Sequence, residues 1–243
     1  MIRLSLLALY LLTAPALAGQ DAGEHFQQQR EALVKEIQAH LEQTSRHIDR
    51  EAFSPKVLEA LREVPRHRFV SPEHRDQAYA NRPLPIGHGQ TISQPFVVAL
   101  MTDLLEPQAE DRVLEVGTGS GYQAAVLAEI VDAVYTIEII EPLARSATKR
   151  LRELGYEGVT VRHGDGYYGW EAHAPYDAIV VTAAASHLPP PLIEQLKAGG
   201  RMVIPVGSRF MTQQLVLVEK DTEGKVTTRQ LLPVAFVPLT GGH

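Results

Sequence analysis

Hydrophobic residues recur with two different periods along this chain. In the first third they return every three to four positions, which is the spacing of one helix face. This pattern predicts an amphipathic helix over residues 24–41 and a second helix over 55–64. Ser54 is the expected N-cap of the second helix, Pro55 its first residue, and Pro65 follows its end. The hydrophobic face of the first helix contains Leu33, Val34, Ile37 and Leu41.

The stretch from residue 81 to residue 90 has no hydrophobic period. It contains two prolines and two glycines, so we predict an irregular loop. The loop leads into the segment Thr91-Ile92-Ser93-Gln94-Pro95. Because long loops of this kind often carry binding or catalytic residues, the segment is a candidate functional element.

From residue 112 onward, short runs rich in β-branched residues alternate with helical segments. This alternation predicts βαβ units in a doubly wound parallel sheet of the α/β class. Two later segments, 213–219 and 226–232, predict a hairpin that adds antiparallel strands at the sheet edge. The predicted parallel strands are 112–116, 133–138, 159–163, 177–182 and 201–205, and the predicted helices between them are 122–130, 142–154 and 190–197.

Composition narrows the function classes. With 243 residues, of which 44% are hydrophobic, the chain can bury a full core as one domain. The net charge of −6 is spread along the sequence without a basic stripe, so no nucleic-acid partner is expected. The absence of cysteine excludes disulfides and thiolate catalysis, and the histidines lack metal-ligand spacing, so no metal is expected. We expect a monomer.

The first eighteen residues resemble a secretory signal. Arg3 precedes an apolar run at 4–12, and the pattern Ala16-Leu17-Ala18 fits a cleavage site. The apolar run is too short to span a membrane, and no second run follows it, so we expect a soluble mature protein. Export to the periplasm is the first interpretation. The alternative is a cytoplasmic protein whose start site has been placed too early.

The strongest chemical signal is a glycine-rich turn after the first predicted sheet strand. The apolar strand that ends at Val116 continues directly into Gly117, Gly119 and Gly121, and a helix follows. Glycines let the backbone turn sharply and approach a ligand, and the N–H groups of the helix favour an anionic group. The G-x-G pattern alone is weak, but its place between a strand and a helix indicates a nucleotide-like ligand.

Two acidic residues at later strand ends extend this signal. Glu138 ends the second sheet strand about 20 positions after Gly117, the offset at which a carboxylate binds ribose hydroxyls. Asp165 lies between two glycines after the third strand, where it could accept a hydrogen bond from an adenine amino group. Taken singly, Glu138 could be a solvated strand end and Asp165 a turn former. Together they indicate a nucleoside.

Tyr122 discriminates between nucleoside ligands. The dinucleotide motif G-x-G-x-x-G/A needs a small last residue so that helix and strand can pack, and Tyr122 occupies that position. This disfavours the first alternative, an NAD-linked oxidoreductase. A G-x-G-x-G turn with Glu115 two residues before it suits a smaller ligand with an amino-acid end. S-adenosylmethionine fits this description.

Four segments together resemble the protein-L-isoaspartate O-methyltransferase family over residues 30–239. They are Leu84-Pro85-Ile86-Gly87-His88-Gly89-Gln90-Thr91-Ile92-Ser93-Gln94-Pro95, Leu114-Glu115-Val116-Gly117-Thr118-Gly119-Ser120-Gly121-Tyr122, His163-Gly164-Asp165-Gly166 and Phe236-Val237-Pro238-Leu239. The resemblance implies methyl transfer from S-adenosylmethionine to the free α-carboxylate of L-isoaspartyl residues in damaged proteins and peptides, which initiates repair through a succinimide. Methylation of a small carboxylic acid, or a non-catalytic nucleoside-binding module, are the alternatives.

The resemblance also implies a doubly wound, Rossmann-like methyltransferase sheet and a set of site residues. Combined with the signal-like N-terminus, this divides the chain into a signal peptide at 1–18, an N-terminal helical segment at 19–80 and a methyltransferase domain at 81–243. The family's active-site serine falls on Ser93, for which a helix N-cap is the alternative interpretation. We expect its hydroxyl, and the N–H groups of the helix after Pro95, to bind the substrate carboxylate. The implied cofactor contacts are Gln90, Thr91, Ile92, Glu115, Gly117, Thr118, Gly119, Ser120, Gly121, Glu138, Ile139, Asp165 and Gly166.

Overall fold

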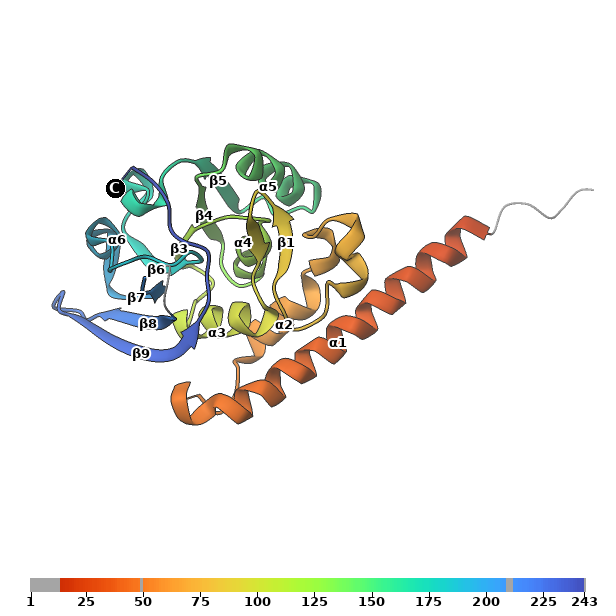
Figure 1. Cartoon of the computed structure of the whole chain (residues 1–243), viewed down its shortest axis with the longest axis horizontal. Helices are drawn as coiled ribbons and strands as arrows, with labels where there is room; N and C mark the ends of the chain where they lie inside the picture. Colours follow the sequence, from red (N-terminus) through yellow and green to blue (C-terminus); the bar gives the residue numbers. More distant parts are fainter. Residues whose placement is uncertain (1–13, 49, 209–211, 243) are drawn as a thin grey trace, which may run out of the picture.

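A mixed seven-stranded sheet forms the centre of the molecule (Figure 1). The computed structural model describes residues 14–48, 50–208 and 212–242. The strands are β3 (Arg112–Val116), β4 (Ala133–Glu138), β5 (Val159–His163), β6 (Tyr176–Val181), β7 (Leu196–Val206), β8 (Gln213–Lys220) and β9 (Val226–Val234). Their spatial order is β5-β4-β3-β6-β7-β8-β9. The first five are parallel, and β8 and β9 are antiparallel to their neighbours.

The predicted doubly wound sheet with antiparallel edge strands is confirmed. The bounds of β3, β4 and β5 agree with the prediction, β6 is displaced by one residue, and β7 begins at Leu196, earlier than expected. The β8–β9 hairpin forms as predicted, because the side chain of Asp221 accepts the N–H groups of Glu223 and Lys225 in its turn. The hydrophobic pattern therefore predicted the positions of the sheet strands in this half of the chain well.

Helices cover both faces of the sheet. One face carries α3 (Pro95–Leu105), α4 (Tyr122–Ala128) and α5 (Glu141–Glu153), and the other carries α6 (Pro190–Gln195) with the short 3-10 turns η3 (Gly166–Tyr168) and η4 (Glu171–His173). Successive strand residues point to opposite faces. Val113 therefore belongs to one hydrophobic core and Leu114 to the other. This burial on both faces explains the continuous hydrophobic strands of the sequence.

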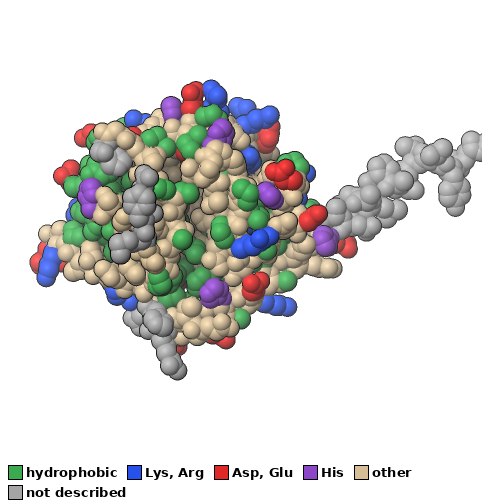
Figure 2. All heavy atoms as spheres, viewed as in Figure 1, with side chains coloured by type: hydrophobic (Ala, Val, Ile, Leu, Met, Phe, Trp, Pro, Cys, Tyr) green, Lys and Arg blue, Asp and Glu red, His purple; other side chains and the backbone are tan. Residues whose placement is uncertain are grey.

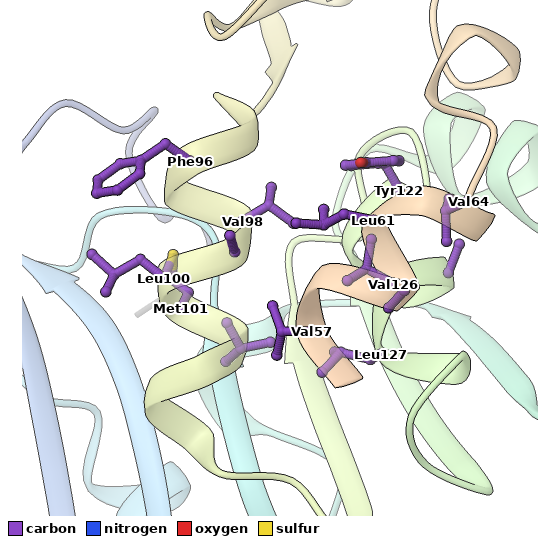
Figure 3. Close-up of a cluster of buried hydrophobic side chains, with 14 of the residues drawn as sticks. Val57, Leu61, Val64, Phe96, Val98, Leu100, Met101, Tyr122, Val126 and Leu127 are labelled. Atoms are coloured by element: carbon purple, nitrogen blue, oxygen red, sulfur yellow. The ribbon is translucent and has the colours of Figure 1, made fainter. Parts of the chain in front are cut away.

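The N-terminal segment packs against the helical face of the sheet. It consists of α1 (Ala14–Ile48), α2 (Pro55–Glu63), η1 (Arg66–Arg68) and η2 (Pro72–Gln77). Figure 3 shows α2 side chains meeting those of α3 and α4 in one buried cluster. The hydrophobic face of α1 joins the same core, while its N-terminal end projects past the body (Figure 1). The segment and the sheet thus share a core.

Two N-terminal predictions differ from the structure in detail, and a third is not tested by it. The first helix is longer than residues 24–41. Ser54 is the N-cap of α2, with Pro55 after it, but its side chain makes no capping hydrogen bond. In the predicted signal segment, residues 1–13 lie outside the described residues, and the remaining residues, 14–18, open α1.

The predicted irregular loop at 81–90 is wrong. The chain instead forms a small hairpin of β1 (Leu84–Gly87) and β2 (Gln90–Ile92), in which Leu84 pairs with Ile92. Gly87, His88 and Gly89 all have positive φ, and this allows the tight reversal. Leu84 and Ile92 are both buried. The hairpin forms because these two side chains join the core.

The surface in Figure 2 mixes acidic, basic and histidine side chains over the same face. An ionic network ties the C-terminal end of α3 to β7 and β8. Arg201 lies 2.7 Å from Glu106 and 3.2 Å from Glu219, and Arg50 lies 2.5 Å from Glu106. Of the helices in the described residues, none is long and apolar enough to cross a bilayer.

Candidate active site

A cavity of about 770 Å³, counting its open mouth, lies at the carboxyl-terminal ends of β3, β4 and β6. The strand order reverses at β3, and doubly wound sheets bind ligands at such a point. The position of this cavity follows from the topology, because the loops after β3 and β6 diverge to opposite faces of the sheet.

Most of the predicted site residues line this cavity, and two do not. Gly121 and Asp165 lie outside the wall. The predicted residues in the wall are Gln90, Thr91, Ile92, Ser93, Glu115, Gly117, Thr118, Gly119, Ser120, Glu138, Ile139 and Gly166. The residues that sequence reasoning missed are Val98, Val116, Tyr122, Gln123, Ile137, Ile140, Thr182, Ala183, Val237, Pro238, Leu239 and Thr240.

The glycine-rich turn forms the floor beside β3. Gly117, Gly119 and Gly121 have φ values of +101°, +52° and +89°. A Cβ on Gly117 would lie 2.4 Å from Oγ1 of Thr182, whose hydroxyl donates to the Gly117 carbonyl at 2.7 Å. A side chain is therefore excluded at Gly117 by both sterics and backbone conformation. The turn lines the cavity with its backbone, and the N–H groups of Gly117, Thr118 and Gly119 donate within the protein.

Glu138 supports the turn from the neighbouring strand. Its Oε2 accepts the Gly119 N–H at 2.8 Å, and its Oε1 accepts the Ile140 N–H at 2.9 Å. The side chain is buried, lies in the cavity wall and belongs to the last residue of β4. A carboxylate held by backbone donors at this edge is oriented before any ligand binds. Its binding to a ribose stays a prediction.

Glu115 is a fully buried carboxyl group at the base of the cavity. Its Oε2 accepts the Thr136 hydroxyl at 2.6 Å, and the hydroxyls of Thr136 and Thr118 also lie 2.6 Å apart. Its Oε1 is buried and has no hydrogen-bond partner in the part of the chain that the structure describes. Burial raises the pKa of Glu115 to about 8; the Glu138 charge adds to this, and the Thr136 hydrogen bond opposes it.

Ser93 lies between the β1–β2 hairpin and α3, half-buried in the cavity wall. The N-cap of α3 is Gln94, so the interpretation of Ser93 as a plain N-cap is wrong. The Phe96 N–H donates to the side chain of Asn81 at 3.0 Å, and the next N–H groups donate to Gln94 O. These N–H groups are engaged within the protein, so the expectation that they bind substrate is not met.

Asp165 is held by its own loop and by the C-terminal segment. Its Oδ1 accepts the Tyr167 N–H and its Oδ2 accepts the Gly242 N–H, both at 3.0 Å. This matches its alternative interpretation as a turn former. Its neighbour Gly166 does line the cavity. The proposed contact of Asp165 with adenine stays a prediction.

Half of the missed residues come from two segments that pair with each other in the cavity wall. Thr182 and Ala183 follow β6, and residues 237–240 run beside them. The N–H of Ala184 donates to Val237 O, and the N–H of Leu239 donates back to Ala184 O, each at 2.8 Å. The motif at 236–239 was the sequence signal that could have identified the C-terminal segment. Its residues alone do not show which side of the sheet the segment crosses.

Fold and site together define an S-adenosylmethionine-dependent methyltransferase of the Rossmann-like type. Residues 35–243 match the family model described as protein-L-isoaspartate(D-aspartate) O-methyltransferase. The chain belongs to this family. The match extends from the middle of α1 to the end of the chain and includes the glycine-rich turn, the hairpin and the C-terminal segment.

Individual relatives agree with this assignment. The protein-L-isoaspartate O-methyltransferase 2 of Syntrophobacter fumaroxidans is 63% identical over 214 residues, covering 88% of this chain and 87% of that protein. A solved protein-L-isoaspartate O-methyltransferase has a TM-score of 0.76 at 28% identity, over 87% of this chain and 66% of that one. A Plasmodium falciparum structure, a putative member of the family in complex with S-adenosyl-L-homocysteine, has a TM-score of 0.68 at 25% identity, over 85% and 97%.

Proposed function

We propose that the chain transfers a methyl group from S-adenosylmethionine to the free α-carboxylate of L-isoaspartyl residues in damaged proteins and peptides. The methyl ester loses methanol to give a succinimide without enzymatic help, and hydrolysis of the succinimide returns part of the residue to normal aspartate. The observation that carries the proposal is one cavity whose wall contains both Ser93 and the glycine-rich turn.

The residues present fit S-adenosylmethionine. Oε1 of Glu115 is a buried acceptor without a partner in the cavity wall, and the amino-acid end of the cofactor carries an ammonium group. A buried acceptor left unpaired costs free energy, so pairing with a cation is favourable. Glu115 and the turn at Gly117 would hold the amino-acid end, and Glu138 would hold the ribose.

The reaction requires alignment of the methyl donor and the acceptor carboxylate more than it requires acid–base catalysis. The α-carboxylate of an isoaspartyl residue has a pKa near ~3.5, so it is already ionised at neutral pH and needs no base. The cofactor, when bound, supplies a methyl group activated by a sulfonium. The protein orients the carboxylate oxygen for in-line attack and excludes water, which contributes on the order of 7–11 kcal/mol. Ser93 orients the acceptor by donating its hydroxyl to the carboxylate.

Replacing Ser93 by alanine tests this role. A hydrogen bond to a charged group contributes about 1.5–3 kcal/mol, so we expect kcat/KM on an isoaspartyl peptide to fall about tenfold to 100-fold. The Kd of S-adenosylhomocysteine should stay within about twofold of wild type. The matched control is Ser54→Ala, since Ser54 also precedes a proline-initiated helix but lies away from the cavity. Unchanged turnover in Ser93→Ala would exclude Ser93 from the reaction.

We also propose that residues 1–18 direct export and are removed after Ala18. The apolar run, the preceding Arg3 and the A-x-A pattern support this proposal. The test is to purify the native protein from separated cell fractions and determine its first residue. Gly19 in an extracytoplasmic fraction is expected, whereas an intact N-terminus in the cytoplasm would overturn it.

A further inference from the structure

Arg66 is a cation that is buried beside the active site and has no counter-ion among the described residues. Its side chain is fully buried in η1. The ion pairs formed within residues 14–48, 50–208 and 212–242 do not include it. Burial lowers the pKa of Arg66 to about 10, so the guanidinium remains charged at neutral pH. Removing such a charge from water is costly, and a purely structural contact could be made by a neutral side chain.

The guanidinium closes the base of the β1–β2 hairpin. On the side that enters β1, Nε donates to Ala78 O at 2.8 Å, and Nη2 lies 3.5 Å from Arg82 O. On the side that leaves β2, Nη2 donates to Ser93 O at 2.8 Å. One planar group therefore connects both ends of the hairpin, and the residue on the second end is Ser93.

The same group also packs against the glycine-rich side of the cavity. Its central carbon lies 4.7 Å from the ring centroid of Tyr122, the first residue of α4. Ser93 and Tyr122 both line the cavity, while Arg66 does not. Arg66 is thus placed directly behind two parts of the wall. It can act on the reaction through them without touching substrate.

Ser93 lies in the link between β2 and α3, where the Arg66 hydrogen bond to its carbonyl helps to fix its backbone. It is not the N-cap of α3, and it follows a β2 strand of only three residues. Its carbonyl accepts a charge-assisted hydrogen bond from Arg66, a type that is stronger and better oriented than a neutral one. A fixed Ser93 backbone is what the orienting role of its hydroxyl requires.

We propose that Arg66 is a positioning residue for methyl transfer: it holds the backbone of Ser93 so that the Ser93 hydroxyl meets the substrate carboxylate. This inference rests on the proposed function, in which Ser93 orients the acceptor. Lysine at this position keeps the charge but loses the planar fork, so it cannot reach the carbonyls on both sides of the hairpin at once.

The test is a double-mutant cycle of Arg66→Lys and Ser93→Ala in the full chain. We expect Arg66→Lys to lower kcat/KM on an isoaspartyl peptide by at least about tenfold, with the Kd of S-adenosylhomocysteine within about twofold of wild type. In the Ser93→Ala background the same substitution should cost less than about twofold, because the group through which it acts is gone. The control is Arg62→Lys, an arginine of α2 whose ion pairs with Glu31 and Glu59 lie away from the cavity.

Rates are expressed per site that binds S-adenosylhomocysteine, so a lower yield of folded enzyme does not count as lost activity. The second variant is Arg66→Gln, which keeps a neutral donor. It should be less stable than wild type but more stable than Arg66→Lys, and it should lose activity. Equal losses in the wild-type and Ser93→Ala backgrounds would overturn the proposal, and so would a cofactor Kd that weakens in parallel with kcat/KM. An inactive wild-type enzyme would instead contradict the proposed function itself.

Discussion

Replacing Glu115 by glutamine should remove a pH dependence from the stability of the folded chain. The pKa of Glu115 is raised from 4.5 to about 8 by burial, so the folded state keeps a proton that the unfolded chain has lost. Stability from this group is therefore present below pH 4.5 and is lost as the pH rises toward 8. In this window each pH unit lowers the free energy of unfolding by at most about 1.4 kcal/mol, so the loss of stability between pH 5.5 and pH 7.5 approaches about 3 kcal/mol.

Urea unfolding at these two pH values measures the effect, with the fluorescence of Trp170, the single tryptophan, as the signal. Other groups titrate as well, so the relevant quantity is the difference between wild type and Glu115→Gln. The variant should gain on wild type as the pH rises. Parallel stability curves for the two proteins would refute the assignment of a protonated, buried Glu115.

Cofactor binding should reverse this behaviour, because an ammonium group beside Oε1 favours the carboxylate form of Glu115. Binding of S-adenosylhomocysteine at pH 7 should then release close to one proton, and Glu115→Gln should release almost none. Calorimetry in buffers of different ionisation enthalpy measures the number of protons. Equal proton release by both proteins would show that the orphaned oxygen does not face the ligand.

Two further predictions concern the walls of the cavity. Gly117→Ala should lower the free energy of unfolding by about 2–4 kcal/mol, because it adds a clash with Thr182 to the strain of a positive φ. The control is Gly155→Ala, at a positive-φ glycine with open space around it, which should lower the free energy of unfolding clearly less in the same urea experiment. Equal losses in the two variants would contradict the clash. Glu138→Gln should weaken S-adenosylhomocysteine binding about tenfold. An amide cannot accept the N–H groups of Gly119 and Ile140 together, and its NH₂ group suits a diol less well than a carboxylate oxygen does. An unchanged Kd by titration would exclude Glu138 from the cofactor site.

The sheet was more predictable than the segment before it. Strands such as β3 are buried on both faces, so their hydrophobic runs mark them without knowledge of their neighbours. The β1–β2 hairpin has no such mark, because Pro85 and Gly87 interrupt it; Leu84 and Ile92 are buried, while Ile86 is only partly buried against the core. Its formation depends on tertiary contacts, including those of Arg66, which the local sequence does not reveal.

The site was predictable where chemistry follows local motifs. Gly117 and Glu138 lie at strand ends, and parallel strands bring their carboxyl ends to one edge, so sequence order alone places them together. The C-terminal segment reaches the cavity only because it pairs with Ala184, a contact between distant parts of the chain. The orphaned Oε1 of Glu115 and the unpaired charge of Arg66 are likewise properties of three-dimensional packing.

The most direct test of the account is methylation of a peptide pair that differs in one linkage. The full chain is incubated with S-adenosylmethionine and either an L-isoaspartyl peptide or the same peptide with normal aspartate, and the products are followed by mass spectrometry. We predict that the isoaspartyl peptide alone gains one methyl group, as a base-labile ester that decays to the succinimide. No methyl gain, or equal gain on both peptides, would contradict the proposed function.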